Sequence, residues 1–496
     1  MPRRRSAFVA AALALTLAAT ACASRADDSD LGNRNSATGK AATTTTAPAA
    51  GSPAKPGAVS WRGCGLGAQC AVVEVPLDYA HPDGDTIPLS VTRVPARKKR
   101  IGALFVNPGG PGGTATDFAA EIASFGLPTE ITDRFDIVGV DPRGLGASDI
   151  NCHGDPHKLY GVDYSLDSPA DTKALLDVSR AYIAGCRDHV GRMLPHLGTA
   201  DDARDIDSVR AAMGDDKLSY LGFSYGTAIG QMLAQLHPDR IRAMVLDGVV
   251  DLGESGLQLA VDQADGFEKA LHDWAADCDA DASCPAGPDA MAAINELSAK
   301  VEQAPIPATP RALGPGELAT GLAQPLYVKD SWPDLSEAVA AALDGDGTKM
   351  VALSDQYLSG SDSDVYFAVN CLDFAWPSDP NAVLAAGKQA AKKAPHFGEP
   401  IVNDYVRCPL WPVHGTPLPK VTAPGTPPIV VISTTNDPAT PYQGGVNVAH
   451  RLRNGVLLTH RGEGHTSFAQ GDSCVDDAVT RYLVDLKPPK DGATCD

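Results

Sequence analysis

Short apolar runs separated by polar and glycine-rich segments recur in two parts of the chain, 71–246 and 428–459. The first two runs partly alternate between apolar and polar residues and predict antiparallel strands at 71–76 and 87–94, joined by a turn at 81–84. The later runs are continuously apolar, as is typical of strands buried on both faces. They lie at 101–106, 135–140, 218–223, 241–246, 428–433 and 455–459.

Helical patterns follow several of these strands, so that strands and helices alternate along the chain. They lie at 199–213, 227–236, 442–452 and 474–486. The first is expected to begin with Thr199 as its capping residue, with Asp201 and Asp202 in the first turn, where acidic side chains stabilise a helix N-terminus. Strands that alternate with helices indicate an α/β fold in which helices cover the sheet.

The pattern changes between residues 251 and 423, where alanine-rich helical segments are separated by proline and glycine and no long apolar strand run occurs. These segments lie at 258–276, 289–303, 336–343 and 381–394. We therefore expect a largely helical lid at 251–423, inserted into an α/β core that comprises 59–250 and 424–496. A chain of 496 residues is long enough for a large core with such an inserted subdomain.

Ser224 lies at the centre of the sequence GFSYG, between the apolar run at 218–223 and the helical pattern at 227–236. A serine at a sharp strand-to-helix turn needs glycine two positions before and after it, because neighbouring backbone passes too close for a side chain. The turn exposes the hydroxyl above the sheet and beside a helix N-terminus, which favours a developing oxyanion. The context predicts a nucleophile; the alternative is a glycine-flanked helix start with serine as its cap.

Two loops rich in glycine and proline follow the strands at 101–106 and 135–140. The first, NPGGPGG, has almost no side chains to pack and exposes backbone N–H groups. Phosphate binding is disfavoured because no lysine follows and the G-x-G-x-x-G spacing is absent, so an oxyanion-hole loop fits better. In the second, DPRGLGAS, Arg143 is expected to tie loops together rather than to contact substrate.

A serine nucleophile needs a base that accepts its proton and an acid that orients the base. His465 lies in a glycine-rich loop after the last predicted strand, and Asp437 directly follows the strand before it. The chain order Ser224, Asp437, His465 is that of an α/β-hydrolase. Asp247, which follows an earlier strand, is the alternative acid, and His237 is interpreted as a helix cap.

Composition excludes several other functions. The formal net charge is −20, which argues against nucleic-acid binding, for which a basic face is expected. No two cysteines form a C-x-x-C sequence, so neither a zinc ribbon nor a thioredoxin-like site is expected. A serine–histidine–aspartate triad needs no metal ion and no other cofactor, and none is predicted.

Eleven cysteines are present, of which Cys22 stands apart in the N-terminal segment. The other ten form an even number, which in an exported protein suggests disulfides. We expect sequential pairs that each close a local loop, although spacing alone leaves other connectivities open. The expected pairs are Cys64–Cys70, Cys152–Cys186, Cys278–Cys284, Cys371–Cys408 and Cys474–Cys495.

Residues 1–21 have the pattern of an export signal, with three arginines before an apolar segment too short to span a bilayer. Cys22 directly follows an Ala-Thr-Ala cleavage site, as in bacterial lipoproteins whose new N-terminal cysteine carries acyl chains such as palmitate. Residue 19 is alanine where such signals usually have leucine, so simple secretion is the alternative. Residues 22–58 contain almost no large apolar side chains and predict a flexible tether.

The chain resembles the tripeptidyl-aminopeptidase-like branch of the α/β-hydrolases from about residue 61 onward, in NPGGPGG, DPRGLGASD, GFSYGT, DGVVD, NCLDF, STTNDPATPY and EGHTSF. The resemblance implies an α/β-hydrolase fold with a helical lid. It makes Ser224 the nucleophile, Asp437 the orienting acid and His465 the general base. It also implies the N–H groups of Gly110 and Tyr225 as oxyanion donors, although the family's HGGPG loop is PGGPG here.

The resemblance further implies an exported serine protease of the cell envelope that takes peptides, held at the outer face of the membrane by a lipid on Cys22 or otherwise secreted. A carboxylesterase that uses the same triad is the alternative, because acyl chemistry is shared and specificity lies in the lid. A solute-binding lipoprotein with an inactive hydrolase fold is a third. An aminopeptidase should offer a carboxylate to the substrate ammonium; Asp373 is a candidate, and its plainer role is to stabilise a loop. The sequence leaves the oligomeric state open.

Overall fold

The fold is built on a ten-stranded sheet with the order β1-β2-β3-β5-β4-β6-β7-β8-β9-β10. The computed structural model describes residues 59–65, 67–166, 168–360 and 362–496, and all of them belong to one compact unit, Ala50–Asp496. β1, β2 and β3 are antiparallel to their neighbours, and the other strands run parallel. The strands are β1 Arg62–Gly65, β2 Ala68–Pro76, β3 Thr86–Val94, β4 Gly102–Asn107, β5 Phe135–Val140, β6 Leu218–Phe223, β7 Ile241–Asp247, β8 Ile429–Asn436, β9 Gly455–Glu463 and β10 Ala493–Cys495.

Helices cover both faces of the sheet, which explains why the parallel strands are continuously apolar. Successive residues of a strand point to opposite faces. Phe105 and Tyr220 therefore pack on the side of α5, α6 and α16, whereas Leu104 and Leu221 pack on the side of α1, α2 and α17. These helices are α1 Ala115–Glu121, α2 Thr129–Thr132, α5 Thr199–Met213, α6 Gly226–Leu236, α16 Tyr442–Arg451 and α17 Ser473–Asp485.

All strands predicted from the apolar runs are present, with ends that differ from the predictions by at most four residues. The two edge strands β1 and β10 are not predicted by the pattern. β1 is exposed and half glycine, and β10 is only 3 residues long, so neither has an apolar run to mark it. The strand order and the helices on both faces confirm the α/β-hydrolase fold.

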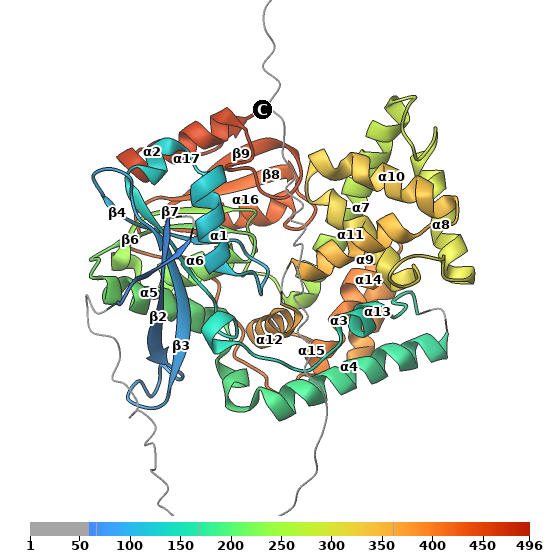
Figure 1. Cartoon of the computed structure of the whole chain (residues 1–496), viewed down its shortest axis with the longest axis horizontal. Helices are drawn as coiled ribbons and strands as arrows, with labels where there is room; N and C mark the ends of the chain where they lie inside the picture. Colours follow the sequence, from blue (N-terminus) through green and yellow to red (C-terminus); the bar gives the residue numbers. More distant parts are fainter. Residues whose placement is uncertain (1–58, 66, 167, 361) are drawn as a thin grey trace, which may run out of the picture. The chain divides into compact units, whose positions relative to one another are not determined.

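Between β7 and β8 the described residues form helices and no strand, apart from an isolated bridge between Ile306 and Leu313. This confirms a largely helical insertion, and Figure 1 shows α7 to α11 and α14 gathered in one group, coloured yellow-green to orange. A separate apolar core holds many of these helices together. The helices are α7 Gly256–Ala280, α8 Ala290–Gln303, α9 Pro315–Leu326, α10 Trp332–Leu343, α11 Thr348–Ser359, α12 Ser363–Asp373, α13 Pro380–Ala390, α14 Gly398–Asp404 and α15 Arg407–Leu410.

The segment between β5 and α5 contains a long helix, α4 (Pro169–His189), and the short helix α3 (Pro156–Tyr160), which the apolar pattern does not predict. The sequence does carry a start signal for α4. The Ser168 side chain accepts hydrogen bonds from the N–H groups of Ala170 and Asp171, and the Asp171 carboxylate accepts one from the Ser168 N–H. This is a capping box, followed by proline at the first helical position.

The start of α5 corrects the expectation that Thr199 caps this helix. Gly198 occupies the cap position and makes no side-chain hydrogen bond, so Thr199 is already the first helical residue. The Thr199 N–H donates to Asp373 at 2.9 Å, and its hydroxyl donates to the same carboxylate oxygen. A carboxylate distant in sequence thus takes the place of a local cap.

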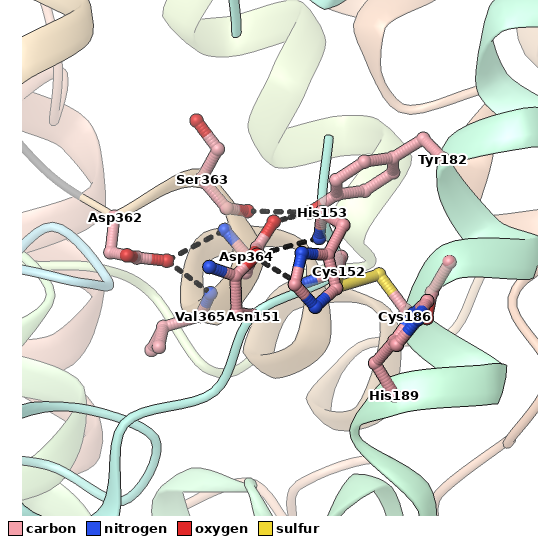
Figure 2. Close-up of a disulfide and its surroundings, with 11 residues drawn as sticks. Asn151, Cys152, His153, Tyr182, Cys186, His189, Asp362, Ser363, Asp364 and Val365 are labelled. Atoms are coloured by element: carbon pink, nitrogen blue, oxygen red, sulfur yellow. Dashed lines mark hydrogen bonds between the residues drawn. A yellow bond between two sulfur atoms is a disulfide. The ribbon is translucent and has the colours of Figure 1, made fainter. Parts of the chain in front are cut away.

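All five predicted disulfides are present. Figure 2 shows the Cys152–Cys186 bond, which joins the loop after β5 to α4. Asp364, at the start of α12, accepts the Cys152 N–H at 2.7 Å and the Tyr182 hydroxyl at 2.7 Å. The inserted helices are therefore connected to α4 beside this disulfide.

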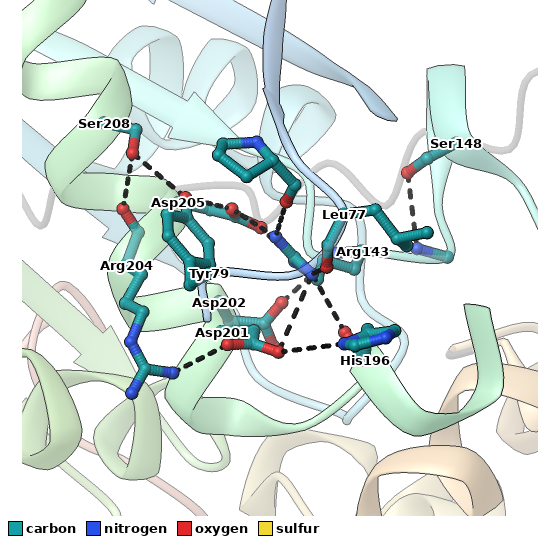
Figure 3. Close-up of polar contacts among 12 residues, drawn as sticks. Leu77, Tyr79, Arg143, Ser148, His196, Asp201, Asp202, Arg204, Asp205 and Ser208 are labelled. Atoms are coloured by element: carbon teal, nitrogen blue, oxygen red, sulfur yellow. Dashed lines mark hydrogen bonds and ion pairs between the residues drawn. The ribbon is translucent and has the colours of Figure 1, made fainter. Parts of the chain in front are cut away.

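Arg143 is buried in the core of the fold, as expected for a residue that ties loops together rather than contacting substrate. Its guanidinium bonds Asp205 through Nε at 2.6 Å and Nη2 at 2.9 Å, and donates to the carbonyl oxygens of Leu77 and Pro76 at 2.7 Å each (Figure 3). A fully buried guanidinium is stable only when its donors are paired in this way. Arg143 connects the ends of β2 and β5 to α5.

Candidate active site

Ser224 occupies the sharp turn between β6 and α6, with a positive φ of 53° that is unusual for a residue with a side chain. Its N–H donates to the Asp247 carbonyl at 2.9 Å. The flanking glycines have no room for a Cβ. One added at Gly222 would lie 2.4 Å from the Gly226 carbonyl oxygen, and one added at Gly226 would lie 2.7 Å from Asn107. The GFSYG spacing therefore has a steric cause.

His465 and Asp437 are in direct contact. Nδ1 of His465 lies 2.9 Å from each carboxylate oxygen of Asp437, which is only 3% exposed. Asp437 also accepts N–H groups from Ala439 and Thr440, each at 2.9 Å. The Thr440 hydroxyl donates to the same carboxylate at 3.0 Å and lies 3.3 Å from His465 Nδ1. These bonds fix the carboxylate against the imidazole.

Electrostatics favour a charged imidazole at this position. Burial by itself lowers the pKa of His465, but the charge and hydrogen bond of Asp437 outweigh it, so the pKa is raised above 6.5. The other ring nitrogen, Nε2, is buried and has no hydrogen-bond partner among the described residues. An imidazole with one nitrogen oriented and the other vacant can accept a proton from a neighbouring group.

The inserted helices hold the loop of His465 in place. The His465 N–H donates to the carbonyl of Tyr327, at the end of α9, at 2.8 Å. The two rings also meet edge to face, with centroids 5.6 Å apart. Tyr327 is a site residue that the sequence analysis misses, because no local motif links α9 to a loop more than a hundred residues later. Thr440 is also missed, although its place in DPAT beside Asp437 offered a signal.

The glycine-rich loop after β4 lies against the turn of Ser224. A Cβ added at Gly109 would lie 2.7 Å from the Ser224 Cβ and 3.0 Å from the Tyr225 nitrogen. The Gly109 N–H is taken by the Asn107 side chain at 2.9 Å. Within the described ranges, the N–H groups of Gly110 and Tyr225 donate to no other residue, and both residues line the cavity that contains Ser224.

Asp247, the alternative acid, is fully buried but does not bond the imidazole. Its side chain instead accepts the N–H groups of Ser467 and Phe468, at 3.0 and 2.8 Å. Burial raises its pKa to about 6, against the effect of these two N–H groups. Asp247 thus supports the loop that follows His465. His237 ends α6 as its C-cap, as expected.

Asp373 does not lie in the cavity, which corrects the expectation that it could receive a substrate ammonium. It is 5% exposed and bonds Thr199 at the start of α5. Burial raises its pKa to about 7. The plainer interpretation, an aspartate that stabilises neighbouring structure, describes this residue.

Ser224 and His465 line one cavity of about 770 Å³ between the strand ends and the inserted helices. The residues that line it include five tyrosines besides Tyr225: Tyr160, Tyr327, Tyr357, Tyr366 and Tyr405. Among the described residues the carboxylates that line the cavity outnumber Lys269, although Asp251 is ion-paired with Arg451 and Asp404 with Arg407. These carboxylates are Asp251, Glu254, Asp262, Asp265 and Asp404. The cavity is large enough for a short peptide and favours a cationic group.

Two clusters have the composition of a metal site among the described residues, Cys152, Cys186 and Asp364, and Asp472, Cys474 and Cys495. In both, the two cysteines are joined in a disulfide. A cysteine binds a metal ion as a thiolate, and a disulfide offers none. Neither cluster is therefore a metal site.

Within the same described residues, no helix is long and apolar enough to cross a membrane. Cys22 lies outside the described ranges.

Comparison with known proteins agrees with this geometry. A family model described as "TAP-like protein" matches residues 394–495. Serine protease Hip1 of Mycobacterium tuberculosis is 38% identical over 460 residues, 86% of this chain and 87% of that protein. Carboxylesterase B of the same species is 38% identical over 451 residues, 86% of each chain. Tripeptidyl aminopeptidase of Streptomyces lividans is 34% identical over 455 residues, 86% of this chain and 83% of that protein.

Proposed function

The chain belongs to the tripeptidyl-aminopeptidase-like family of α/β-hydrolases, and from this premise we propose that it is a serine protease that cleaves peptides through an acyl-enzyme on Ser224. The observation that carries the proposal is the imidazole of His465. Asp437 holds its Nδ1 at 2.9 Å, while its buried Nε2 is vacant in the cavity wall that also presents Ser224.

In the proposed mechanism, His465 takes the proton of the Ser224 hydroxyl through Nε2 while the oxygen attacks a peptide carbonyl. Asp437 keeps the Nδ1 proton in place and stabilises the imidazolium that forms. His465 then gives its proton to the leaving amine. Water, deprotonated by the same imidazole, hydrolyses the acyl-enzyme and frees Ser224.

The negative charge on the carbonyl oxygen needs donors that are already in position. The N–H groups of Gly110 and Tyr225 suit this role, since both residues line the cavity beside Ser224 and neither N–H is used by another described residue. Tyr225 also begins α6, where the helix dipole adds positive potential. Two such donors act on charge that develops only as the reaction proceeds.

The acidic cavity wall favours peptides with a free N-terminus. An aminopeptidase must accept an ammonium group close to the reacting carbonyl, and carboxylates near the site lower the free energy of that charge. Asp265 on α7 supports this preference, because it lines the cavity and its Oδ1 is buried with no partner in the described structure. Ester hydrolysis is the second candidate, favoured by the close similarity to carboxylesterase B and by the apolar face that the tyrosines offer.

Matched substrates test the proposal. We expect the purified enzyme to release the leaving group from tripeptidyl amides with a free N-terminus, and much more slowly from the same amides with an acetylated N-terminus, because acetylation removes the positive charge. Initial rates for both, and for short acyl esters with the same leaving group, provide the measurement. Equal rates for free and acetylated amides would indicate an endopeptidase, and ester turnover without amide cleavage would indicate a carboxylesterase.

We also propose that the enzyme is exported and anchored through Cys22. Support comes from the signal-like residues 1–21, the lipobox-like sequence before Cys22 and the tether-like composition of 22–58. Five disulfides fit an oxidising compartment outside the cytosol.

Replacing Cys22 by alanine should move the enzyme from the membrane fraction to the culture medium, because the acylated thioether would no longer form. Activity assays and immunoblots of cell fractions would show the shift, and the matched variant Ser24→Ala should stay with the membrane. If wild-type protein is already in the medium, simple secretion is the correct interpretation.

A further inference from the structure

Tyr225 has a buried side chain that the proposed mechanism does not use, since only its backbone N–H is assigned a role. The residue is 4% exposed. Its phenolic oxygen lies 2.8 Å from the Thr199 hydroxyl and 3.0 Å from a carboxylate oxygen of Asp202. Both partners lie in the first turn of α5. The phenol thus attaches the start of α6 to the start of α5.

The chain of contacts continues into the inserted helices. Thr199 donates both its N–H, at 2.9 Å, and its hydroxyl to Asp373, the last residue of α12. α12 also supplies Tyr366 and Asn370 to the cavity wall. The insertion is therefore linked to Tyr225, the proposed oxyanion donor, through four buried side chains: Asp373, Thr199, Tyr225 and Asp202.

These four side chains make three oxygen–oxygen contacts in a row: Asp373 with Thr199, Thr199 with Tyr225, and Tyr225 with Asp202. Each contact needs one hydrogen. The hydroxyls of Thr199 and Tyr225 supply only two hydrogens. If both carboxylates were ionised, Thr199 would donate to Asp373 and Tyr225 to Asp202, and no hydrogen would remain between Thr199 and Tyr225. A third hydrogen, on one carboxyl group, satisfies all three contacts. The row of four side chains therefore requires one proton that its two carboxyl groups share.

Asp202 is the better holder of this proton. Burial and the neighbouring Asp205 raise its pKa well above the ordinary value, and Arg143 only partly opposes them. The positive charge of Arg143 is already balanced by its bonds to Asp205 (Figure 3). The titratable and charged groups around the four side chains include Tyr79, Arg143, His196, Asp201, Asp205 and Tyr220.

We propose that Asp202, Thr199 and Asp373 are positioning residues that hold Tyr225 through this shared proton and so keep its N–H directed at the oxyanion. The inference rests on the proposed function, which makes the Tyr225 N–H an oxyanion donor. In the satisfied arrangement the Asp202 carboxyl donates to Tyr225, Tyr225 donates to Thr199, and Thr199 donates to ionised Asp373. Tyr225 is then fixed at both ends, through its backbone in the turn and through its phenol in the core.

Tyr225→Phe tests the positioning role, because it removes the phenol oxygen and keeps the backbone N–H. We expect kcat to fall roughly tenfold with KM nearly unchanged, since an oxyanion donor displaced by a fraction of an ångström loses part of its effect only in the transition state. Thr199→Val should act in the same direction. Tyr182→Phe is the matched control, because Tyr182 is also buried and bonded to a carboxylate, Asp364, but takes no part in this row of hydrogen bonds. The kcat of Tyr182→Phe should equal that of the wild type.

Asp202→Asn tests the shared proton, because an amide can donate to Tyr225 at every pH and can still accept the Arg143 N–H with its oxygen. In the wild type, kcat should decline as rising pH removes the proton from Asp202, and this decline should be absent in Asp202→Asn. A merely structural role would lower the melting temperature without changing the pH profile.

Two outcomes would overturn the inference: a wild-type kcat for Tyr225→Phe, or a decline of kcat with rising pH that Asp202→Asn retains. If Asp202→Asn does not fold, the kcat and KM of Tyr225→Phe decide by themselves. Failure of the proposed function is recognised separately, because a Ser224→Ala enzyme would then remain active whatever Tyr225→Phe does.

Discussion

Replacing Ser224 by alanine should lower kcat by roughly 10⁶-fold, the scale found when the nucleophile of a serine protease is removed. Alanine keeps the Cβ and cannot form the acyl-enzyme, while the cavity and the oxyanion donors stay as they are. Initial rates with the free tripeptidyl amide and with the acyl ester provide the measurement. Both reactions should be lost together, because both pass through the same serine ester.

A matched variant separates the loss of the nucleophile from damage to the cavity. Ser363 also lines the cavity, and Ser363→Ala should keep kcat close to the wild-type value. Thermal unfolding of Ser224→Ala should be unchanged or slightly shifted upward, since the strained backbone of residue 224, with its positive φ, is present in both proteins. Substantial turnover by Ser224→Ala would show that another group is the nucleophile.

Replacing Asp437 by asparagine should lower kcat by roughly 10⁴-fold, as in serine proteases where the orienting aspartate becomes an amide. In the wild type, both carboxylate oxygens of Asp437 lie 2.9 Å from His465 Nδ1 and hold the proton on this nitrogen. An amide nitrogen in this place favours the opposite tautomer, in which Nε2 carries the proton and cannot accept one from Ser224. Steady-state rates across pH, with KM measured alongside, would show the loss in kcat.

Asp247→Asn distinguishes the two candidate acids. Asp247 accepts the N–H groups of Ser467 and Phe468 rather than the imidazole proton. We expect this variant to lower thermal stability and to reduce kcat far less than Asp437→Asn does, because an amide oxygen can still accept those N–H groups. A larger loss of kcat in Asp247→Asn than in Asp437→Asn would reverse the assignment.

Local features of the sequence were sufficient for the strands and for the central turn. The buried strands have continuously apolar runs because helices cover both faces of the sheet, and that pattern is written in consecutive residues. The GFSYG turn is equally local, since Gly222 and Gly226 leave no room for a Cβ. Each disulfide joins two cysteines that follow one another in the sequence, as predicted, although their separations range from 6 to 37 residues.

A periodic apolar pattern does not predict every helix and strand of this fold. α4 begins with a capping box at Ser168, which is a short polar signature, and its buried stripe is narrow among mostly small and polar residues. The stripe comprises Leu175, Ser179, Tyr182, Ile183 and Cys186. β1 and β10 lie at the sheet edges, where pairing on one side alone requires no apolar run. These elements depend on caps and neighbours more than on their own hydrophobicity.

The sequence by itself thus determined the buried strands of the sheet, the turn of Ser224 and the order in which Ser224, Asp437 and His465 follow their strands. Only the tertiary structure decided which groups meet. Asp373 bonds Thr199 rather than a substrate, and Tyr327 holds the loop of His465. The physical reason is that steric and hydrophobic constraints act between neighbours in sequence, whereas a hydrogen bond between distant segments exists only after the chain has packed.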